Sequence, residues 1–179
     1  MSLLSYLELV ELVESGVIEG VDPLCINSAS IDVHLGNQIV AEVPNDYPVD
    51  IHKREIFSST KYLLGEGGTY TMLPGEFILA QTKEIFHLPN NIVAEFYLKS
   101  SGARTGLEHL HAGHCDPGWN NSVLTLELKN VLRYQPIVLT EGMRIGQMLF
   151  YRVREVPENR SYATIGRYNG DKSAQTVKL

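Results

Sequence analysis

Alternation of apolar and polar residues constrains the fold of this chain more than any other feature. In residues 30–36 the apolar side chains alternate with Asp32 and His34. Because successive side chains on a strand point to opposite faces, this period of two predicts half-buried strands. Turn signals such as Pro-Gly, Glu-Gly and Gly-Gly separate the runs, which favours an all-β barrel or jelly roll over an α/β fold. The same alternation recurs in residues 92–99, 123–129 and 145–151.

Only the beginning of the chain carries a clear helical period. Ser5 and Glu8 form an S-x-x-E capping box, and Gly16 supplies a stop signal. The sequence therefore predicts one short N-terminal helix ahead of the strands. Its apolar residues recur at helical spacing at Leu3, Leu7 and Val10.

The composition excludes several classes of function. A chain of 179 residues suits a single domain, 1–179, against a soft prior of roughly 150 residues per domain. Its 15 basic and 21 acidic residues give a net charge of −6, which disfavours nucleic acid as a partner. No apolar run approaches the roughly 18 residues that cross a membrane. The two cysteines, Cys25 and Cys115, form no CxxC motif, so we expect a reducing, cytoplasmic compartment.

Glu127 is the most informative residue in a stretch rich in reactive side chains, residues 99–130. Leu126 and Leu128 face one side of the predicted strand, so Glu127 faces the other. Two interpretations remain open: a surface carboxylate beside Lys129, or a general acid/base facing a bound small molecule. The preceding turn, which is rich in Asp, His and Trp, favours the second.

Residues 99–104, KSSGAR, have the composition of a phosphate site. Hydroxyl groups of Ser100 and Ser101 can donate to an anion, and the Arg104 guanidinium matches it in two-point geometry. Taken alone, the same pattern also occurs in ordinary turns.

Five possible zinc ligands follow closely, at His109, His111, His114, Cys115 and Asp116. The H-x-E and P-C-x-x-C signature of zinc-dependent nucleobase deaminases is absent from the sequence, however. We therefore expect polar histidines in a surface hairpin, a buried Cys115, and no zinc.

The last 21 residues, 159–179, differ in charge from the rest of the chain. They carry four cations and one acid, Asp171. Two interpretations are open: a solvated, frayed terminus, or a mobile cationic flap that closes on an anionic ligand.

In order along the chain, these segments resemble the dCTP deaminase branch of the dUTPase-like superfamily. The matching segments are INSASIDVHLG (26–36), KSSGAR, HAGHCDPGW, VLTLELKN, EGMRIGQMLF (141–150) and GRYNGDKSAQ in the tail. The resemblance implies a distorted β jelly roll and a homotrimer with shared active sites. It also implies zinc-independent deamination of dCTP to dUTP and ammonia, with Mg²⁺ held by the triphosphate.

The resemblance also assigns roles to individual residues. Glu127 would be the catalytic glutamate, Ser100 would help to hold the water, and the Ala112 backbone would contact water and base. The residues that would bind the substrate are Lys99, Ser101 and Arg104 at the phosphates, Asp116 and Trp119 at the deoxyribose, and Arg167, Tyr168 and Lys172 in the flap.

Two departures from the family pattern stand out. Lys99 occupies a position where the family usually has Arg, which keeps the charge but loses the two-point geometry. One extra residue at Asn120 and Asn121 separates the turn from the glutamate, and a β-bulge there would restore Glu127 to its face.

Three alternative functions remain. A bifunctional enzyme would deaminate dCTP and also hydrolyse the triphosphate, releasing dUMP. A plain dUTPase would need Asp116 but not Glu127. A trimeric nucleotide-binding module without activity would keep only the fold.

Overall fold

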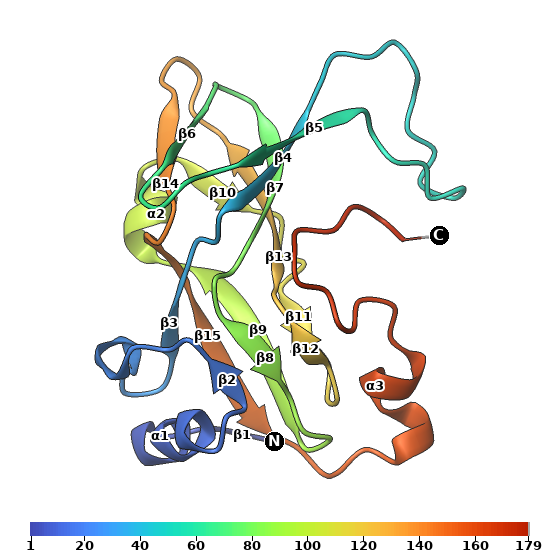
Figure 1. The fold of residues 1–179 in the computed structure, drawn as a ribbon. Coiled ribbons are helices and arrows are strands. Elements are labelled where there is room, and N and C mark those ends of the chain that lie inside the picture. The colour runs from blue at the N-terminus through green and yellow to red at the C-terminus, as the bar shows by residue number, and fades with distance from the viewer. Residues whose placement is uncertain (179) are drawn as a thin grey trace.

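Strands dominate the chain, as the alternation predicts. The computed structural model describes residues 1–178, so Leu179, the last residue of the predicted tail, lies outside the described residues. The strands are β1 (Ser2–Leu3), β2 (Ile18–Glu19), β3 (Ile31–His34), β4 (Gln38–Glu42), β5 (Ser59–Leu63), β6 (Thr69–Met72), β7 (Phe77–Gln81), β8 (Ile85–His87), β9 (Ile92–Leu98), β10 (Leu107–His109), β11 (His114–Cys115), β12 (Asn120–Ser122), β13 (Thr125–Asn130), β14 (Ile137–Thr140) and β15 (Arg144–Arg152). The helices are α1 (Tyr6–Glu14), α2 (Ser100–Arg104) and α3 (Tyr162–Ile165), with 3₁₀ turns η1 (Pro23–Cys25) and η2 (Glu158–Arg160). The predicted all-β class is confirmed (Figure 1).

Two five-stranded antiparallel sheets form the body. In the first, β15 is central: β9 pairs along one edge, β1 and β3 pair with successive parts of the other, and β11 extends the sheet beyond β9. The second has the order β10-β13-β7-β4-β5 and carries Glu127 on β13. Two small sheets, β12-β8-β2 and β14-β6, complete the fold.

The four alternating segments form β3, β9, β13 and β15, within one or two residues of the predicted bounds. The prediction fails for one side chain. Alternation placed Asp32 on a polar face, but it is only 2 % exposed, as buried as its apolar neighbours. The reason is an ion pair with Lys99, which lets a carboxylate occupy an interior position.

The N-terminal helix also forms, with a different buried face from the predicted one. The Glu8 carboxylate accepts hydrogen bonds from the Ser5 backbone and hydroxyl, which confirms the capping box. Leu3, however, belongs to β1, and Leu7 is 70 % exposed. Leu9 and Leu12 are the buried residues instead. The helix begins only at Tyr6, so its phase relative to the core is set by these later leucines.

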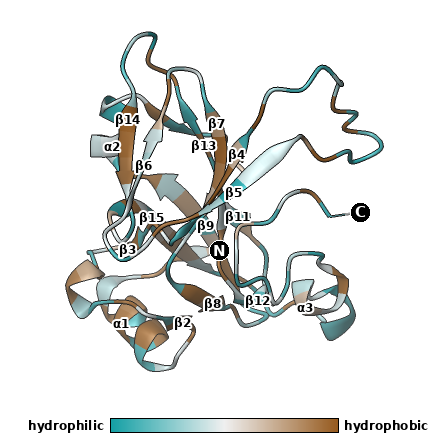
Figure 2. Cartoon of the chain, turned by 45° about the horizontal axis from the view of Figure 1, so that its top comes forward, coloured by the Kyte–Doolittle hydropathy of each residue, from teal (hydrophilic) through white to brown (hydrophobic). Residues whose placement is uncertain are grey.

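One contiguous hydrophobic core joins the helix to both main sheets. Its largest fully buried side chains include Leu9 of α1, Phe150 of β15, Ile78 of β7 and Leu126 of β13. Brown segments mark β4, β7 and β14, whereas β5 is pale and the projecting connection mixes teal and brown (Figure 2).

Two segments extend over or away from this body. The connection between β4 and β5, residues 43–58, projects outward, and the chain after β15 runs through η2 and α3 and returns past β12 and β13 (Figure 1). Backbone hydrogen bonds hold this return in place, from Val123 N–H to the Asp171 carbonyl and from Gly170 N–H to the Asn120 carbonyl. The predicted tail therefore lies packed against its own chain in this conformation.

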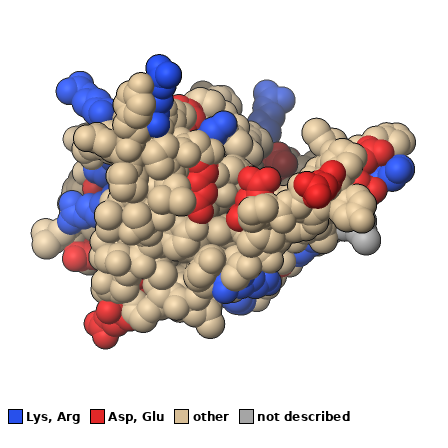
Figure 3. Space-filling view, turned by 90° about the horizontal axis from the view of Figure 1, so that it is seen from above, with Lys and Arg blue, Asp and Glu red and all other residues tan. Residues whose placement is uncertain are grey.

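Charged side chains are dispersed on the surface. On the face shown in Figure 3, basic and acidic groups form small separate patches, with acidic side chains toward the projecting connection. Within residues 1–178, none of the helices has the length and apolar character needed to cross a membrane.

Candidate active site

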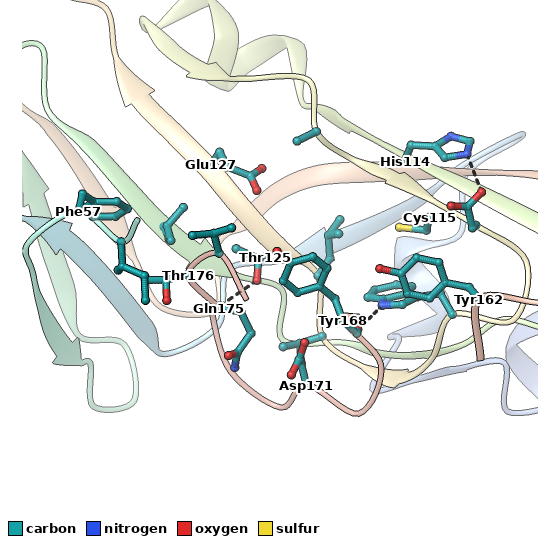
Figure 4. A pocket seen from close by; sticks show the side chains of 18 residues that line it. Phe57, His114, Cys115, Thr125, Glu127, Tyr162, Tyr168, Asp171, Gln175 and Thr176 are labelled. Atoms are coloured by element: carbon teal, nitrogen blue, oxygen red, sulfur yellow. Dashed lines mark hydrogen bonds and ion pairs between the residues drawn. The ribbon is translucent and has the colours of Figure 1, made fainter. Parts of the chain in front are cut away.

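A cavity of about 380 Å³ lies between β13, the turn before it and the folded-back tail. Five predicted site residues line it, namely Ala112, Asp116, Trp119, Glu127 and Tyr168. Figure 4 shows Glu127 pointing into the space between Phe57 on one side and Tyr162 and Tyr168 on the other. The sequence analysis did not anticipate the contribution of Ile56 and Phe57 from the β4–β5 connection.

Glu127 reaches the cavity because the alternation of β13 holds. Leu126 and Leu128 are fully buried in the core, while Thr125 and Glu127 line the cavity on the opposite face. The expected bulge is confirmed just upstream. The register between β12 and β8 shifts between Asn120 and Ser122, and Asn121 has a positive φ of 53°. Asn tolerates this left-handed backbone, so the extra residue is absorbed before β13 begins.

His109 lies directly behind the Glu127 carboxylate. Its Nε2 is 3.4 Å from Glu127 Oε2, and both atoms are buried without a hydrogen-bond partner among residues 1–178. The Phe96 ring packs edge-on against the imidazole at 4.8 Å between centroids. Two polar atoms without hydrogen-bond partners therefore face each other at the inner end of the cavity.

The sequence analysis considered His109 as a possible metal ligand and expected a polar histidine in a surface hairpin, but the structure buries it at 4 % exposure. A signal did exist. In the run Leu107-Glu108-His109, alternation puts His109 on the same side as buried Leu107, and the structure buries both.

The D-P-G-W turn connects the cavity to the tail. Gly118 has a φ of 85°, and a Cβ there would lie 2.0 Å from Ser161 Oγ, so only glycine fits. Trp119 stacks on Phe86 at 5.4 Å, and its indole N–H donates to the Tyr168 carbonyl at 2.9 Å. Trp119 therefore holds Tyr168 at the cavity.

The two predicted flap cations, Arg167 and Lys172, are not among the residues that line the cavity. Lys172 donates to Asn121 Oδ1 at 2.6 Å, and Arg167 is exposed. Lys178, which the sequence analysis did not single out, pairs with Asp171 at 2.6 Å. Of the three predicted flap residues, only Tyr168 lines the cavity.

The charge of the cavity is wrong for a triphosphate held by one chain alone. Its charged lining residues are Asp116, Glu127 and Asp171, and no Lys or Arg is among the described residues that line it. The predicted phosphate residues Ser100, Ser101 and Arg104 are exposed on α2 instead. Two views place α2 and α3 on opposite sides of the molecule (Figures 1 and 2). Lys99, also predicted to bind substrate, is already paired with Asp32 at 2.7 Å.

Of the five possible zinc ligands, only His114 and Asp116 lie within ion-pair distance of each other among the described residues. His109 faces Glu127, exposed His111 lies 3.6 Å from Glu108, and His114 lies 3.4 Å from Asp116. Cys115 is buried, and burial raises the pKa of its thiol. Across residues 1–178, no three His, Cys, Asp or Glu side chains are grouped closely enough to hold a metal ion.

Comparison with known proteins identifies the family of this chain. Residues 3–153 match the family described as dCTP deaminase-like. A protein of Methanosphaerula palustris named "dCTP deaminase, dUMP-forming" is 34 % identical over 158 residues, which cover 88 % of this chain and 83 % of the relative. A protein of Haloarcula marismortui named "dCTP deaminase" is 32 % identical over 188 residues, covering 99 % of this chain and 94 % of the relative.

A solved structure shares the fold. The 2'-deoxycytidine 5'-triphosphate deaminase from Agrobacterium tumefaciens superposes with a TM-score of 0.66 at 21 % identity. The match covers 85 % of this chain and 49 % of that one, so this chain spans about half the length of the Agrobacterium protein. From the family match over residues 3–153 and the two relatives, this chain belongs to the dCTP deaminase-like family, and it is an enzyme of the deaminase kind.

Proposed function

We propose that this enzyme converts dCTP and water into ammonia and dUTP, and then hydrolyses the dUTP to dUMP and pyrophosphate in the same site. The observation that carries the proposal is Glu127 lining a cavity together with Ala112, Asp116 and Trp119. The sequence favoured dUTP as the released product, with dUMP as the alternative. The relative in Methanosphaerula palustris and another in Thermobifida fusca, 37 % identical over 176 residues, are both named as dUMP-forming, which supports the alternative.

In the deamination step, Glu127 acts as the general base and then as the general acid. Its carboxylate takes a proton from water, whose oxygen bonds to the ring carbon that bears the amino group. Glu127 delivers this proton to the ring nitrogen beside that carbon, then moves the remaining proton of the added hydroxyl to the amino nitrogen, and ammonia leaves as the ring carbonyl forms. Buried His109 at the far carboxylate oxygen limits the movement of Glu127 and keeps its other oxygen toward the cavity.

The second step requires a carboxylate at the phosphate end, and Asp116 is the candidate. It lines the same cavity as Glu127 and is half exposed, beside His114. We assign it the water that attacks the α-phosphorus, breaking the bond to the pyrophosphate oxygen. Two acids at separate positions of one cavity are what a sequential reaction on the base and the phosphates requires.

We further propose that the active site is shared between copies of the chain in a homotrimer. The charged residues that line the cavity are all acidic. The predicted phosphate-binding residues of α2 lie exposed on the other side of the same chain. A closed three-fold ring brings α2 of one copy to the cavity of its neighbour by symmetry.

Magnesium would bind through the triphosphate, where it would neutralise phosphate charge. The chain offers no cage of its own among residues 1–178, because no group of three metal-binding side chains occurs there. The two cysteines are buried and unpaired, in keeping with the reducing, cytoplasmic compartment that we propose.

Product analysis tests the reaction. The protein is incubated with dCTP and Mg²⁺, and ammonia, pyrophosphate and nucleotides are measured at early times, with a parallel incubation with dUTP. We expect dUMP and pyrophosphate to rise in step with ammonia. Accumulation of dUTP without pyrophosphate would restrict the enzyme to deamination, and absence of ammonia would refute both steps.

Subunit mixing tests the shared site. Glu127→Gln protein, which lacks the general base, and Arg104→Ala protein, which binds dCTP weakly, are unfolded together, refolded and assayed at a dCTP concentration at which neither is appreciably active alone. In a shared site some interfaces combine an intact Glu127 with an intact Arg104, so activity returns. Light scattering of the wild type should report about three or six times the 20.0 kDa of one chain. A fully active monomer would contradict the shared site.

A further inference from the structure

A buried carboxylate outside the cavity is tied to the predicted phosphate segment. Asp32 of β3 is 2 % exposed, and the Lys99 ammonium donates to both of its oxygens at 2.7 Å. The Asn27 side chain donates to Oδ1 at 2.9 Å, and Arg144 Nη1 lies 3.6 Å from Oδ2. The carboxylate is therefore fully occupied by groups of its own chain.

The charges of this cluster show which cation is committed. A buried carboxylate is tolerated only when it is paired and hydrogen-bonded, and Lys99 makes the shortest charged contacts. Turning Lys99 toward a phosphate would leave Asp32 unpaired in the interior. Arg144, whose side chain is 49 % exposed, carries the surplus positive charge.

Lys99 lies at the start of the predicted phosphate-binding segment, so its pairing with Asp32 also affects that segment. Lys99 follows the last residue of β9, Leu98, and directly precedes α2. Its carbonyl accepts the Ala103 N–H at 3.1 Å, which closes the only full turn of α2. Ser100 and Ser101 lie within that turn, and Arg104 is the last residue of α2. The pair therefore fixes the residue from which the phosphate segment starts.

We propose that Asp32 is a positioning residue for phosphate binding and that Lys99 is its anchor instead of a phosphate ligand. Asp32 holds Lys99, Lys99 fixes the start of α2, and α2 presents the hydroxyls and the Arg104 guanidinium. The inference rests on the proposed function for the identity of the anion, a nucleoside triphosphate. It assigns a role to a residue that strand alternation had placed on a polar face.

The direction in which Asp32→Asn changes the affinity for dCTP distinguishes the two possible roles of Lys99. If Lys99 bound phosphate directly, Asp32→Asn would release its charge and tighten dCTP binding. If Lys99 is the anchor, the same substitution loosens α2 and weakens binding. We expect the Kd for dCTP with Mg²⁺, measured by calorimetry, to rise at least roughly tenfold, as expected from losing one partner of a buried pair. Unchanged or tighter binding would overturn the proposal.

Kinetics supply a readout that a purely structural role would not move. We expect Asp32→Asn and Lys99→Met to raise KM while kcat stays within about threefold, because Glu127 is not displaced. Lys99→Arg keeps the charge and should stay close to wild type. Lys61→Met, on the exposed strand β5, is the matched control and should change neither constant.

The double variant keeps the test decisive if one single variant does not fold. Replacing both charges removes the buried pair without leaving an orphan. Asp32→Asn with Lys99→Met should therefore bind dCTP no more weakly than Lys99→Met alone. Additive losses in the double variant would overturn the anchor.

Failure of the anchor can be told apart from failure of the proposed function. If wild-type protein neither binds nor deaminates dCTP, the proposed function is wrong. In that case thermal unfolding of the wild type, Asp32→Asn, Lys99→Met and the double variant still measures the coupling between Asp32 and Lys99. Coupling in stability together with no effect of either residue on dCTP binding would refute the positioning role alone.

Discussion

Replacing the Glu127 carboxylate by an amide should separate catalysis from stability. Glu127→Gln keeps the size and the planar shape of the side chain and removes its ability to take a proton. A positioned general acid/base contributes roughly 100-fold to 10,000-fold, so we expect deamination to fall by that factor. This corresponds to about 2.7–5.5 kcal/mol in activation free energy.

The structure predicts that the same substitution, Glu127→Gln, does not lower the folding stability. Glu127 Oε2 is buried without a hydrogen-bond partner, 3.4 Å from His109 Nε2. Replacing that oxygen by an amide removes an unpaired acceptor or supplies a donor to the imidazole, a gain of up to about 1 kcal/mol. Activity should therefore collapse while the melting temperature stays constant or rises.

Three measurements on one preparation check this prediction. Ammonia release gives the rate, calorimetry gives dCTP binding, and differential scanning calorimetry gives stability. Thr125→Ser, which alters the neighbouring cavity residue by one methyl group, serves as the matched control. A Glu127→Gln protein within a few-fold of the wild-type rate would refute the catalytic role. A large drop in melting temperature would refute the reading of the His109 contact.

Three further predictions follow from the site. Arg104→Ala should weaken dCTP binding by about tenfold to a hundredfold, as expected for a charge-assisted contact, and normal binding in calorimetry would contradict the phosphate role of α2. Purified protein should hold no stoichiometric zinc by elemental analysis, and activity lost to a chelator should return with Mg²⁺ alone; one zinc per chain would instead support the His109–Cys115 segment as a metal site. Because burial raises the pKa of Cys115, the unfolded thiol ionises first as the pH rises; the stability from this group is full below about pH 9 and falls above it, and Cys115→Ala should flatten that part of the stability profile.

The four segments predicted as strands form strands because local alternation and local burial agree at most of their positions. Glu127 is found on its expected face, since flanking Leu126 and Leu128 have only one way into the core. Asp32 breaks the agreement. Its partner Lys99 is 67 residues away in sequence, so no local pattern reports that this polar position is interior.

The site is predicted less completely than the fold for the same reason. Residues within one motif, such as Asp116 and Trp119, are found together. Residues from separate motifs are not found together. The predicted phosphate residues lie on α2, while Lys172 hydrogen-bonds to Asn121 and Lys178 pairs with Asp171. The α1 prediction fails on a smaller scale, since Leu3 is drawn into β1 by pairing with Tyr151 and the helix starts later.

The bulge at Asn121 does two things at once, and this links the register of the catalytic strand to the tail. It absorbs the extra residue that would otherwise turn Glu127 into the core. It also turns polar groups outward, where Asn121 accepts from Lys172 and the Asn120 carbonyl accepts from Gly170 N–H. Asn169 Oδ1 in turn accepts from the Asn120 backbone N–H at 2.8 Å. An insertion in the strand approach is therefore matched by a docking point for the segment that closes the cavity. The backbone at residues 120 and 121 therefore sets both the face of β13 on which Glu127 lies and the position of the tail that carries Tyr168. We expect a deletion at this bulge to displace both residues.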